Sequence, residues 1–148
     1  MERPPQLDLI RAIREEFARR FLPLTQTAYD RGVGMVDEKL LSSVGVEPHE
    51  HDNMPDLVLY CSEKNWLLLA QAATSSGPIG TERHQALSRT FSASRAELVF
   101  LSAMADRETF RRHADSISWQ THVWIASDPD HLIHFNGARF LGPYPHQS

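Results

Sequence analysis

The most constraining feature of the sequence is a pair of apolar runs joined by a short polar turn. Residues 56–60 and 66–73 flank the stretch Cys61-Ser62-Glu63-Lys64-Asn65. The second run is almost continuously apolar, which is typical of a strand buried on both faces. Two such runs separated by a turn of this length predict an antiparallel β-hairpin.

Helical and strand patterns alternate after this hairpin. We expect helices over 82–92, capped by Thr81, and over 107–116, capped by Asp106. Strands are expected over 97–102 and 123–126, and a final hairpin joins 131–135 to 138–141 through Asn136-Gly137. Strand–helix–strand order requires crossover connections. The sequence therefore predicts an α/β fold with a mixed central sheet flanked by helices.

The part before the hairpin is less regular. An amphipathic helix is expected over 9–21, where Leu9, Ile13 and Phe17 recur at helical spacing. Proline and glycine interrupt residues 22–53, and only 37–44 reads as a short helix there. The length of 148 residues fits one domain. We expect a helical or irregular N-terminal part over 1–50 and a core over 51–144.

Composition restricts the class of protein only weakly. The net charge of −4 does not favour a strongly basic nucleic-acid binder. Arginine far outnumbers lysine, which suits phosphate contacts, although a GC-rich genome explains the same bias. No apolar run reaches the roughly 18 residues of a membrane span. The single Cys61 and the absence of a basic, apolar leader predict a cytoplasmic protein.

The hairpin brings chemically distinctive residues together. If the turn is centred between Glu63 and Lys64, facing residues have numbers that add up to 127, and Asp56 faces Gln71. Ala73 leaves the strand on the same face as Gln71. A carboxylate at such a position can hold Mg²⁺, which polarises a phosphate and activates water. Pro-Asp ahead of a strand is common by chance, so the dipeptide alone predicts little.

Four segments of the chain strengthen this interpretation. They are MPDLVLYCSEKNWLLLAQAATSSGP, LVFLSAMADRETFRRH, ISWQTHVWIA and HLIHFNGARFLGPY. In order and spacing they resemble the BsuBI/PstI family of type II restriction endonucleases. The resemblance implies a PD-(D/E)XK nuclease fold, Mg²⁺-dependent cleavage of double-stranded DNA, and recognition of a short palindrome, CTGCAG in the named members. It also implies a homodimer, as a two-fold DNA site favours.

The resemblance carries over only in part. Asp56 matches the family's metal-binding aspartate, and Gln71 stands where its members typically have glutamate. Ala73 stands where the general nuclease motif has lysine, but members of this family also tend to be apolar there. A strand ending in Gly-Asp-Thr, usual in the family ahead of Met35, is not found in LTQTAYDRGVGMVDE. Members are also longer, with an N-terminal DNA-binding region that this chain is expected to lack.

These observations leave two functions open. The first is an Mg²⁺-dependent endonuclease domain of weak activity, with Asp56 and Gln71 as metal ligands and Glu16, or its neighbour Glu15, as an additional carboxylate. The second is an inactive remnant that keeps the fold and at most binds DNA or a partner subunit. The residues expected to contact DNA are Thr74, Ser75, Arg83, Arg107 and Arg111. For Arg107 and Arg111, a solvated helix face with internal ion pairs is an equally good interpretation.

Overall fold

A seven-stranded mixed sheet forms the centre of the computed structural model, which describes residues 5–47, 53–74 and 77–138. The strands lie in the order β2-β1-β3-β4-β5-β6-β7. Their bounds are β1 Thr25–Asp30, β2 Met35–Val36, β3 Leu57–Cys61, β4 Trp66–Ala72, β5 Glu97–Met104, β6 Thr121–Ile125 and β7 Leu132–Phe135. The pairs β4–β5 and β5–β6 are parallel, and the other neighbours are antiparallel.

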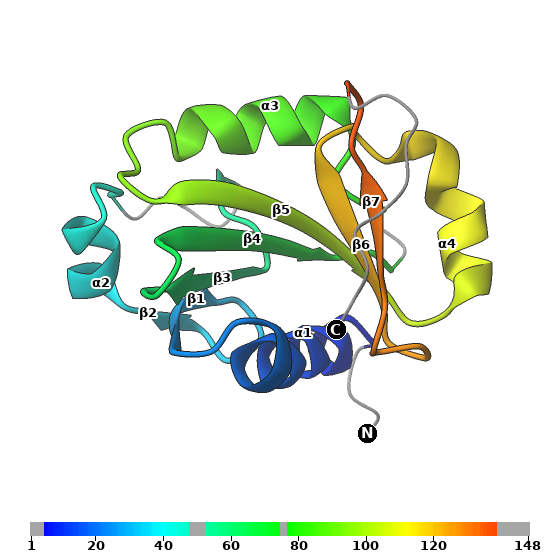
Figure 1. Cartoon of the computed structure of the whole chain (residues 1–148), viewed down its shortest axis with the longest axis horizontal. Helices are drawn as coiled ribbons and strands as arrows, with labels where there is room; N and C mark the ends of the chain where they lie inside the picture. Colours follow the sequence, from blue (N-terminus) through cyan, green and yellow to red (C-terminus); the bar gives the residue numbers. More distant parts are fainter. Residues whose placement is uncertain (1–4, 48–52, 75–76, 139–148) are drawn as a thin grey trace, which may run out of the picture.

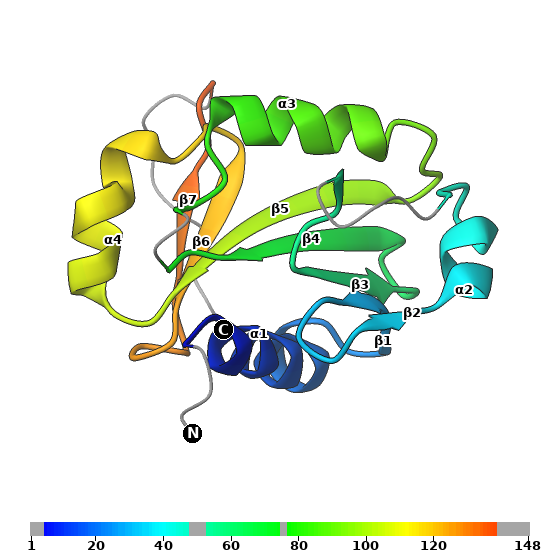
Figure 2. The same ribbon diagram turned by 180° about the vertical axis from the view of Figure 1, so that it is seen from behind.

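Helices cover both faces of this sheet (Figure 1). The helix α1 (Pro5–Glu16) continues into a π-helical turn, η1 (Phe17–Phe21), on one face. The helix α3 (Thr81–Thr90) lies on the opposite face, and Figure 2 shows the same arrangement from behind. The remaining helices are α2 (Glu38–Ser43), α4 (Arg107–His113) and the 3-10 turn η3 (Ala114–Ser116). The expected α/β architecture with flanking helices is confirmed.

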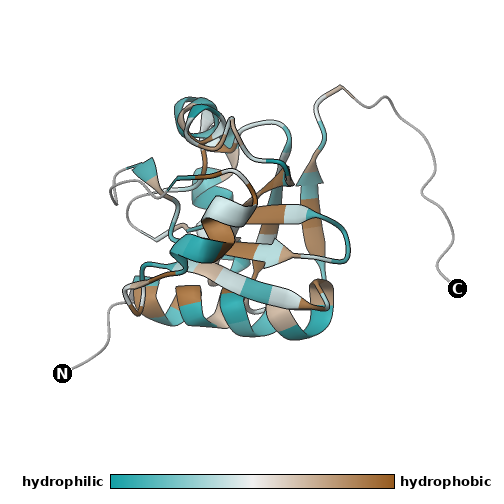
Figure 3. Cartoon of the chain, turned by 90° about the vertical axis from the view of Figure 1, so that its left-hand side faces the viewer, coloured by the Kyte–Doolittle hydropathy of each residue, from teal (hydrophilic) through white to brown (hydrophobic). Residues whose placement is uncertain are grey.

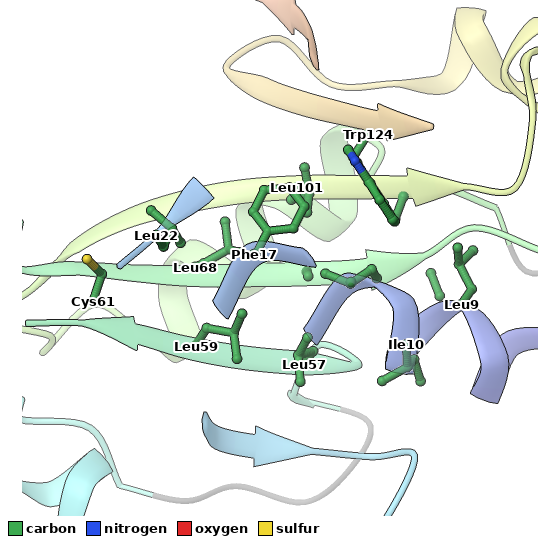
Figure 4. Packing of buried hydrophobic residues seen from close by; sticks show 14 residues of the cluster. Leu9, Ile10, Phe17, Leu22, Leu57, Leu59, Cys61, Leu68, Leu101 and Trp124 are labelled. Atoms are coloured by element: carbon green, nitrogen blue, oxygen red, sulfur yellow. The ribbon is translucent and has the colours of Figure 1, made fainter. Parts of the chain in front are cut away.

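Two main hydrophobic clusters hold the helices to the sheet. On the α1 side, Ile10, Ile13 and Phe17 are buried against Leu57, Leu68 and their neighbours (Figure 4). Hydrophobic and hydrophilic residues alternate along α1, as Figure 3 shows, because only one face of this helix meets the sheet. On the other side, residues of α2 and α3, including Leu41 and Leu87, pack on the opposite face of β3 and β4. Successive side chains along each strand point to opposite faces of the sheet, so the same strands contribute residues to both clusters.

The expected hairpin is present with the expected register. Strands β3 and β4 pair from Leu57↔Ala70 to Cys61↔Trp66, so paired residue numbers add up to 127. Cys61 belongs to the strand, and the turn is therefore residues 62–65 rather than 61–65. The positive φ of Asn65, 55°, places this residue in the left-handed region that such a turn requires.

Several expected boundaries are corrected. The first helix begins at Pro5 rather than Leu9, and β5 extends to Met104. The N-cap of α3 is Gly80, not Thr81, and it makes no side-chain cap hydrogen bond. The expected Asp106 cap of α4 is confirmed, because its carboxylate accepts from the backbone N–H of Thr109 at 2.9 Å.

The first strand of the expected last hairpin is present as β7. The strand β7 pairs with β6, its predecessor in the chain. The expected strand over 138–141 falls almost wholly outside the described residues. A strand that was not found in the sequence does precede Met35: β1 lies there and pairs with β2, although it ends in Tyr29-Asp30 and not in Gly-Asp-Thr. In the described ranges, no helix has the length and apolarity needed to cross a bilayer.

Candidate active site

Asp56 lies immediately before β3, at the end of the sheet where β4 finishes. The last β3–β4 pair is Leu57↔Ala70, so the next step of the same register sets Asp56 opposite Gln71. The strand β3 itself begins one residue later, at Leu57. The carboxylate of Asp56 extends beyond Gln71, and its Oδ2 accepts a hydrogen bond from the backbone N–H of Ala72 at 2.8 Å. The side chain of Asp56 is therefore fixed by a hydrogen bond to the backbone of Ala72, the residue after Gln71.

The carboxylate of Asp56 is fully buried and well supplied with donors. The Nε2 of Gln6, in the first turn of α1, lies 3.2 Å from each of its oxygens. The Nη1 of Arg31 forms an ion pair with Oδ1 at 3.1 Å. Burying a carboxylate is costly unless it is paired and hydrogen-bonded. Here Gln6, Arg31 and the Ala72 amide together satisfy that requirement.

Two arginines meet at the residue that precedes Pro55-Asp56. The carbonyl oxygen of Met54 accepts from Nη2 of Arg31 at 3.1 Å and from Nη2 of Arg83, on α3, at 2.6 Å. The backbone N–H of Arg31 also donates to the carbonyl of Asp56 at 2.9 Å. Arg83, an expected DNA contact on α3, therefore contacts Met54, two residues before Asp56.

Gln71 contributes an unused acceptor. It lies in β4 beside Ser102 of β5, and its side chain alternates with those of Ala70 and Ala72, which face α1. Its Oε1 is buried without a hydrogen-bond partner in the described part of the chain. A buried acceptor of this kind costs free energy until a donor or cation satisfies it. Ala73 is buried in an apolar cluster with Met104 and Ile117, so no charge is supplied there.

A second buried carboxylate, missed in the sequence, stands beside this site. Asp30 is the last residue of β1 and is paired with Leu57 of β3. Its side chain is fully buried, is ion-paired with Nη1 of Arg14, and accepts from the N–H of Gly32 at 2.8 Å. The alternation of Thr25, Thr27 and Tyr29 ahead of a glycine-rich turn is the signal that could have revealed β1, and with it Asp30.

Glu16 is placed away from Asp56. The first turn of α1 contacts Asp56 through Gln6, and Glu16 follows ten residues later, about 15 Å further along the helix axis. Its carboxylate faces Arg20 at 3.4 Å. Glu15 is exposed. The structure thus does not bring either carboxylate to the start of β3.

The other expected DNA contacts are dispersed. Thr74 follows β4 and is partly exposed, whereas Ser75 lies outside the described residues. Arg107 and Arg111 lie one turn apart on α4 and are both exposed. Arg107 has an acidic neighbour, Asp128, at 3.9 Å. Figure 1 shows α4 beyond β6 and β7, at the far side of the sheet from β1.

The donor set at this end of the sheet carries less negative charge than Mg²⁺ sites in proteins usually provide. Mg²⁺ in proteins takes oxygen ligands, commonly one or two carboxylates. Across the described ranges, no three histidine, cysteine or acidic side chains come together as a possible metal site. No hydrogen bond or ion pair links Asp56 with Gln71 in those ranges. Asp56 is already ion-paired with Arg31, and Gln71 offers only a neutral oxygen.

A separate hollow lies on the α1 face of the sheet. It has a volume of about 480 Å³ and an apolar lining from η1, β4 and β5, with His122 and His134 at its edge. These two histidines are cross-strand neighbours, and their Nδ1 atoms are 2.6 Å apart. Burial, and then the proximity of His134, lower the pKa of His122. Neither Asp56 nor Gln71 lines this hollow.

Comparison with known proteins identifies close relatives of the whole described fold. Residues 2–138 match the family described as the BsuBI/PstI restriction endonuclease domain. The type II restriction enzyme BsuBI of Bacillus subtilis is 48% identical over 141 residues, which are 93% of this chain and 45% of that enzyme. The type II restriction enzyme AplI of Arthrospira platensis is 34% identical over 109 residues, 72% of this chain and 34% of that enzyme.

A solved structure shares the fold. The structure of SdaI restriction endonuclease superimposes with a TM-score of 0.87 at 38% identity, over 97% of this chain and 46% of that one. The mixed sheet with helices on both faces is thus a restriction-endonuclease fold. The chain spans less than half the length of each of these relatives.

Proposed function

Because the chain belongs to the BsuBI/PstI restriction endonuclease domain family, we propose that it acts on duplex DNA as a weak, Mg²⁺-dependent type II endonuclease domain. The observation that carries this proposal is the retention of Asp56 at the start of β3, buried and fixed against β4. Family membership supports DNA as the substrate. The expected target is a short palindrome, CTGCAG in the family that the sequence resembles.

The proposed weakness follows from charge. Bound Mg²⁺ supplies Lewis-acid polarisation of a phosphate and a water of lowered pKa. Asp56 and Gln71 are the proposed ligands, and Gln71 lacks the charge that a glutamate would supply. One unit charge at 4 Å is worth about 4 kcal/mol at an effective dielectric constant near 20. That ceiling corresponds to about three powers of ten in metal affinity.

This chain's own residues have other roles in the proposal. Gln6 and the Ala72 amide orient the carboxylate of Asp56. Arg83, on α3, contacts the carbonyl of Met54 and is proposed to contact a DNA phosphate, for which a planar guanidinium is well suited. Thr74 and Ser75 are proposed to contribute hydroxyl contacts to the same backbone. Glu16, which the structure places toward the other end of α1, is not proposed as a ligand.

The proposed assembly is a homodimer on the DNA. A palindrome presents two equivalent half-sites, and a two-fold dimer matches them. The whole of residues 1–148 is proposed to act as a single nuclease-like domain in the cytoplasm. Sedimentation of the chain with a CTGCAG duplex should therefore give two copies of the protein per duplex.

An inactive remnant is the second candidate, and a specific observation favours it. The one carboxylate retained at the expected metal position is neutralised by Arg31. A protein of this kind would keep the fold and bind DNA, or a partner subunit, without cutting.

Plasmid cleavage separates the two candidates. A supercoiled plasmid containing CTGCAG is incubated with the wild-type chain or with Asp56→Ala, in Mg²⁺ or Mn²⁺. We expect slow nicking by the wild type and none by Asp56→Ala, because the alanine removes the proposed anionic ligand. A plasmid without the target serves as the control. Binding of the CTGCAG duplex without nicking in either metal would support the remnant instead.

A further inference from the structure

In the described residues, the end of the sheet that carries Asp56 contains two buried ion pairs. Two buried carboxylates lie there, Asp30 and Asp56, and both are fully buried. Each has its own guanidinium, Arg14 for Asp30 and Arg31 for Asp56. Within the described residues, a divalent cation that approaches either carboxylate therefore meets a guanidinium already paired with it.

Arg31 is held in this position by more than the ion pair. It directly follows Asp30, and its backbone N–H donates to the carbonyl of Asp56 at 2.9 Å. Its Nη1 contacts Oδ1 of Asp56, while its Nη2 donates to the carbonyl of Met54 at 3.1 Å. The guanidinium thus spans the Met54–Asp56 segment with two of its nitrogens. A planar fork of donors can make such a two-point contact, whereas a lysine ammonium is a point charge.

We propose that Arg31 serves as the built-in counter-ion of Asp56 in the place of a metal ion, so that Mg²⁺ reaches this carboxylate only in competition with the guanidinium. The inference rests on the proposed function for its choice of Mg²⁺ as the competing ion. It adds a positioning residue that the comparisons do not assign. It also gives a second reason, besides Gln71, for weak metal binding by this chain.

The test is a calorimetric Mg²⁺ titration together with thermal unfolding in EDTA and in Mg²⁺, without DNA. The variant is Arg31→Gln, and Arg83→Gln is the matched control. Both arginines donate to the carbonyl of Met54, but only Arg31 pairs with Asp56. Any effect of losing a guanidinium near Met54 is therefore common to both variants, and an effect through Asp56 belongs to Arg31→Gln alone.

We expect Arg31→Gln to bind Mg²⁺ at least about tenfold more tightly than the wild type, since a unit charge at this distance exceeds that effect. Its Tm should fall in EDTA, because Asp56 loses its counter-ion, and should recover in part with Mg²⁺. Adding Asp56→Asn to Arg31→Gln should abolish both the binding and the recovery. Arg83→Gln should bind Mg²⁺ as the wild type does.

Equal Mg²⁺ affinity in the wild type and Arg31→Gln would overturn the inference. If Arg31→Gln does not fold in EDTA, Arg31→Met replaces it, because methionine keeps an unbranched apolar side chain without the charge. An unchanged Mg²⁺ affinity in Arg31→Met would then overturn the inference. The result is independent of the proposed function, because it is read without DNA. Tighter Mg²⁺ binding by Arg31→Gln combined with an uncut plasmid would support the inference and reject the nuclease.

Discussion

Gln71 and Arg31 are the two residues that set the charge at the start of β3. Gln71 brings an oxygen without a charge, and its Oε1 is buried without a partner in the described ranges. Arg31 brings a positive charge to Asp56, the one carboxylate that matches a metal ligand by resemblance. Gln71, in the place of a glutamate, lacks a negative charge that would attract a cation. Arg31 supplies a positive group that competes with a cation for Asp56. At the residue scale, the question of activity is therefore one of charge.

Substitution of Gln71 by glutamate should strengthen metal binding. The side chain keeps nearly the same shape while a formal negative charge is added next to Asp56 in register. We expect Gln71→Glu to bind Mg²⁺ more tightly, with a gain in binding free energy of at most about 4 kcal/mol. Nicking of the plasmid should appear or increase. Without Mg²⁺, carboxylate repulsion should slightly lower the free energy of unfolding. Calorimetric titration and nicking of the two proteins side by side measure these effects.

The control for this experiment is Gln71→Ala, which removes the oxygen without adding charge. If Gln71→Glu neither binds Mg²⁺ more tightly nor cuts, the missing charge at Gln71 is not the limiting defect. Combination with Arg31→Gln then asks whether the guanidinium masks the gain. Residues in contact or sharing a partner are expected to be non-additive in such a cycle.

Two elements toward the β7 edge of the sheet are expected to respond to pH or to salt. The β6–β7 hairpin places His122 opposite His134, and the rings meet nearly edge to face at 4.8 Å. The helix α4 follows β5 and presents several arginines to solvent. The first element should respond to pH and the second to salt.

The His122–His134 pair should weaken the fold in mild acid. Burial and His134 lower the pKa of His122 in the folded protein below its ordinary value near 6.5. A lowered pKa means that the unfolded chain binds the proton more tightly. The contribution of neutral His122 to the free energy of unfolding is therefore present above about pH 6.5. It is lost as the pH falls through the pKa of His122 in the folded protein. We expect the free energy of unfolding of His122→Gln to fall less than that of the wild type between pH 7 and pH 5.

His131 provides a control of opposite sign. A hydrogen bond from its ring to Asp128, and the charge of Asp128, raise the pKa of this exposed histidine. Its contribution is present at low pH and is lost as pH rises through the folded pKa. Denaturant unfolding of His131→Gln should therefore show a steeper loss toward low pH than the wild type. Identical pH profiles for the wild type and His122→Gln would contradict the assignment.

The helix α4 is the element to test for salt-dependent DNA binding. Arg107 and Arg111 are exposed on it, and an acidic chain must bind DNA through local arginine contacts. Each neutralised phosphate releases counterions, so binding should weaken as salt rises. We expect the Arg107→Ala/Arg111→Ala variant to bind a CTGCAG duplex more weakly, with a salt slope smaller by up to about two.

Fluorescence anisotropy across a salt series measures this slope. The control is Arg89→Ala, which removes an exposed arginine from α3. Unchanged binding by the double alanine variant would exclude α4 from the DNA interface. In that event the guanidinium of Arg83, which contacts Met54, is the next to neutralise.

At the scale of the whole molecule, α1 ties together distant parts of the chain. Phe17, the first residue of η1, which continues α1, meets Trp124 of β6 edge to face with ring centres 5.7 Å apart. Trp124 is buried, and its Nε1 donates to the carbonyl of Pro129 at 3.1 Å. Residues 9–22 and Trp124 of β6, which are far apart in the sequence, thus share one hydrophobic cluster. Unfolding of the described fold is expected to be cooperative for this reason.

Removal of Trp124 should show this coupling. We expect Trp124→Ala to lower the free energy of unfolding by about 3–5 kcal/mol, the usual cost of truncating a buried aromatic side chain. Denaturant unfolding followed by far-UV circular dichroism and by tyrosine fluorescence measures the loss, and the two transitions should coincide. Trp119→Ala is the matched control, because Trp119 is 65% exposed. A comparable loss in both variants would contradict the argument.

Local patterns in the sequence determined several features correctly. The hairpin register follows from the turn position, since an antiparallel pair has a constant sum of residue numbers. The cap of α4 follows from Asp106, whose side chain accepts from the backbone N–H of Thr109, three residues later. The alternation of strands and helices gave the α/β class. Each of these depends on near neighbours along the chain, whose spacing the sequence displays directly.

Only the tertiary structure decided what surrounds Asp56. Arg31 is 25 positions away, and Gln6 is 50 positions away, on a helix on one face of the sheet. The strand β1, which carries Asp30 and leads to Arg31, was hidden in a stretch rich in glycine and proline. Cross-strand partners such as His122 and His134 were equally invisible. A buried charge selects whichever opposite charge the folded backbone brings within reach, and no periodicity in the sequence records that choice.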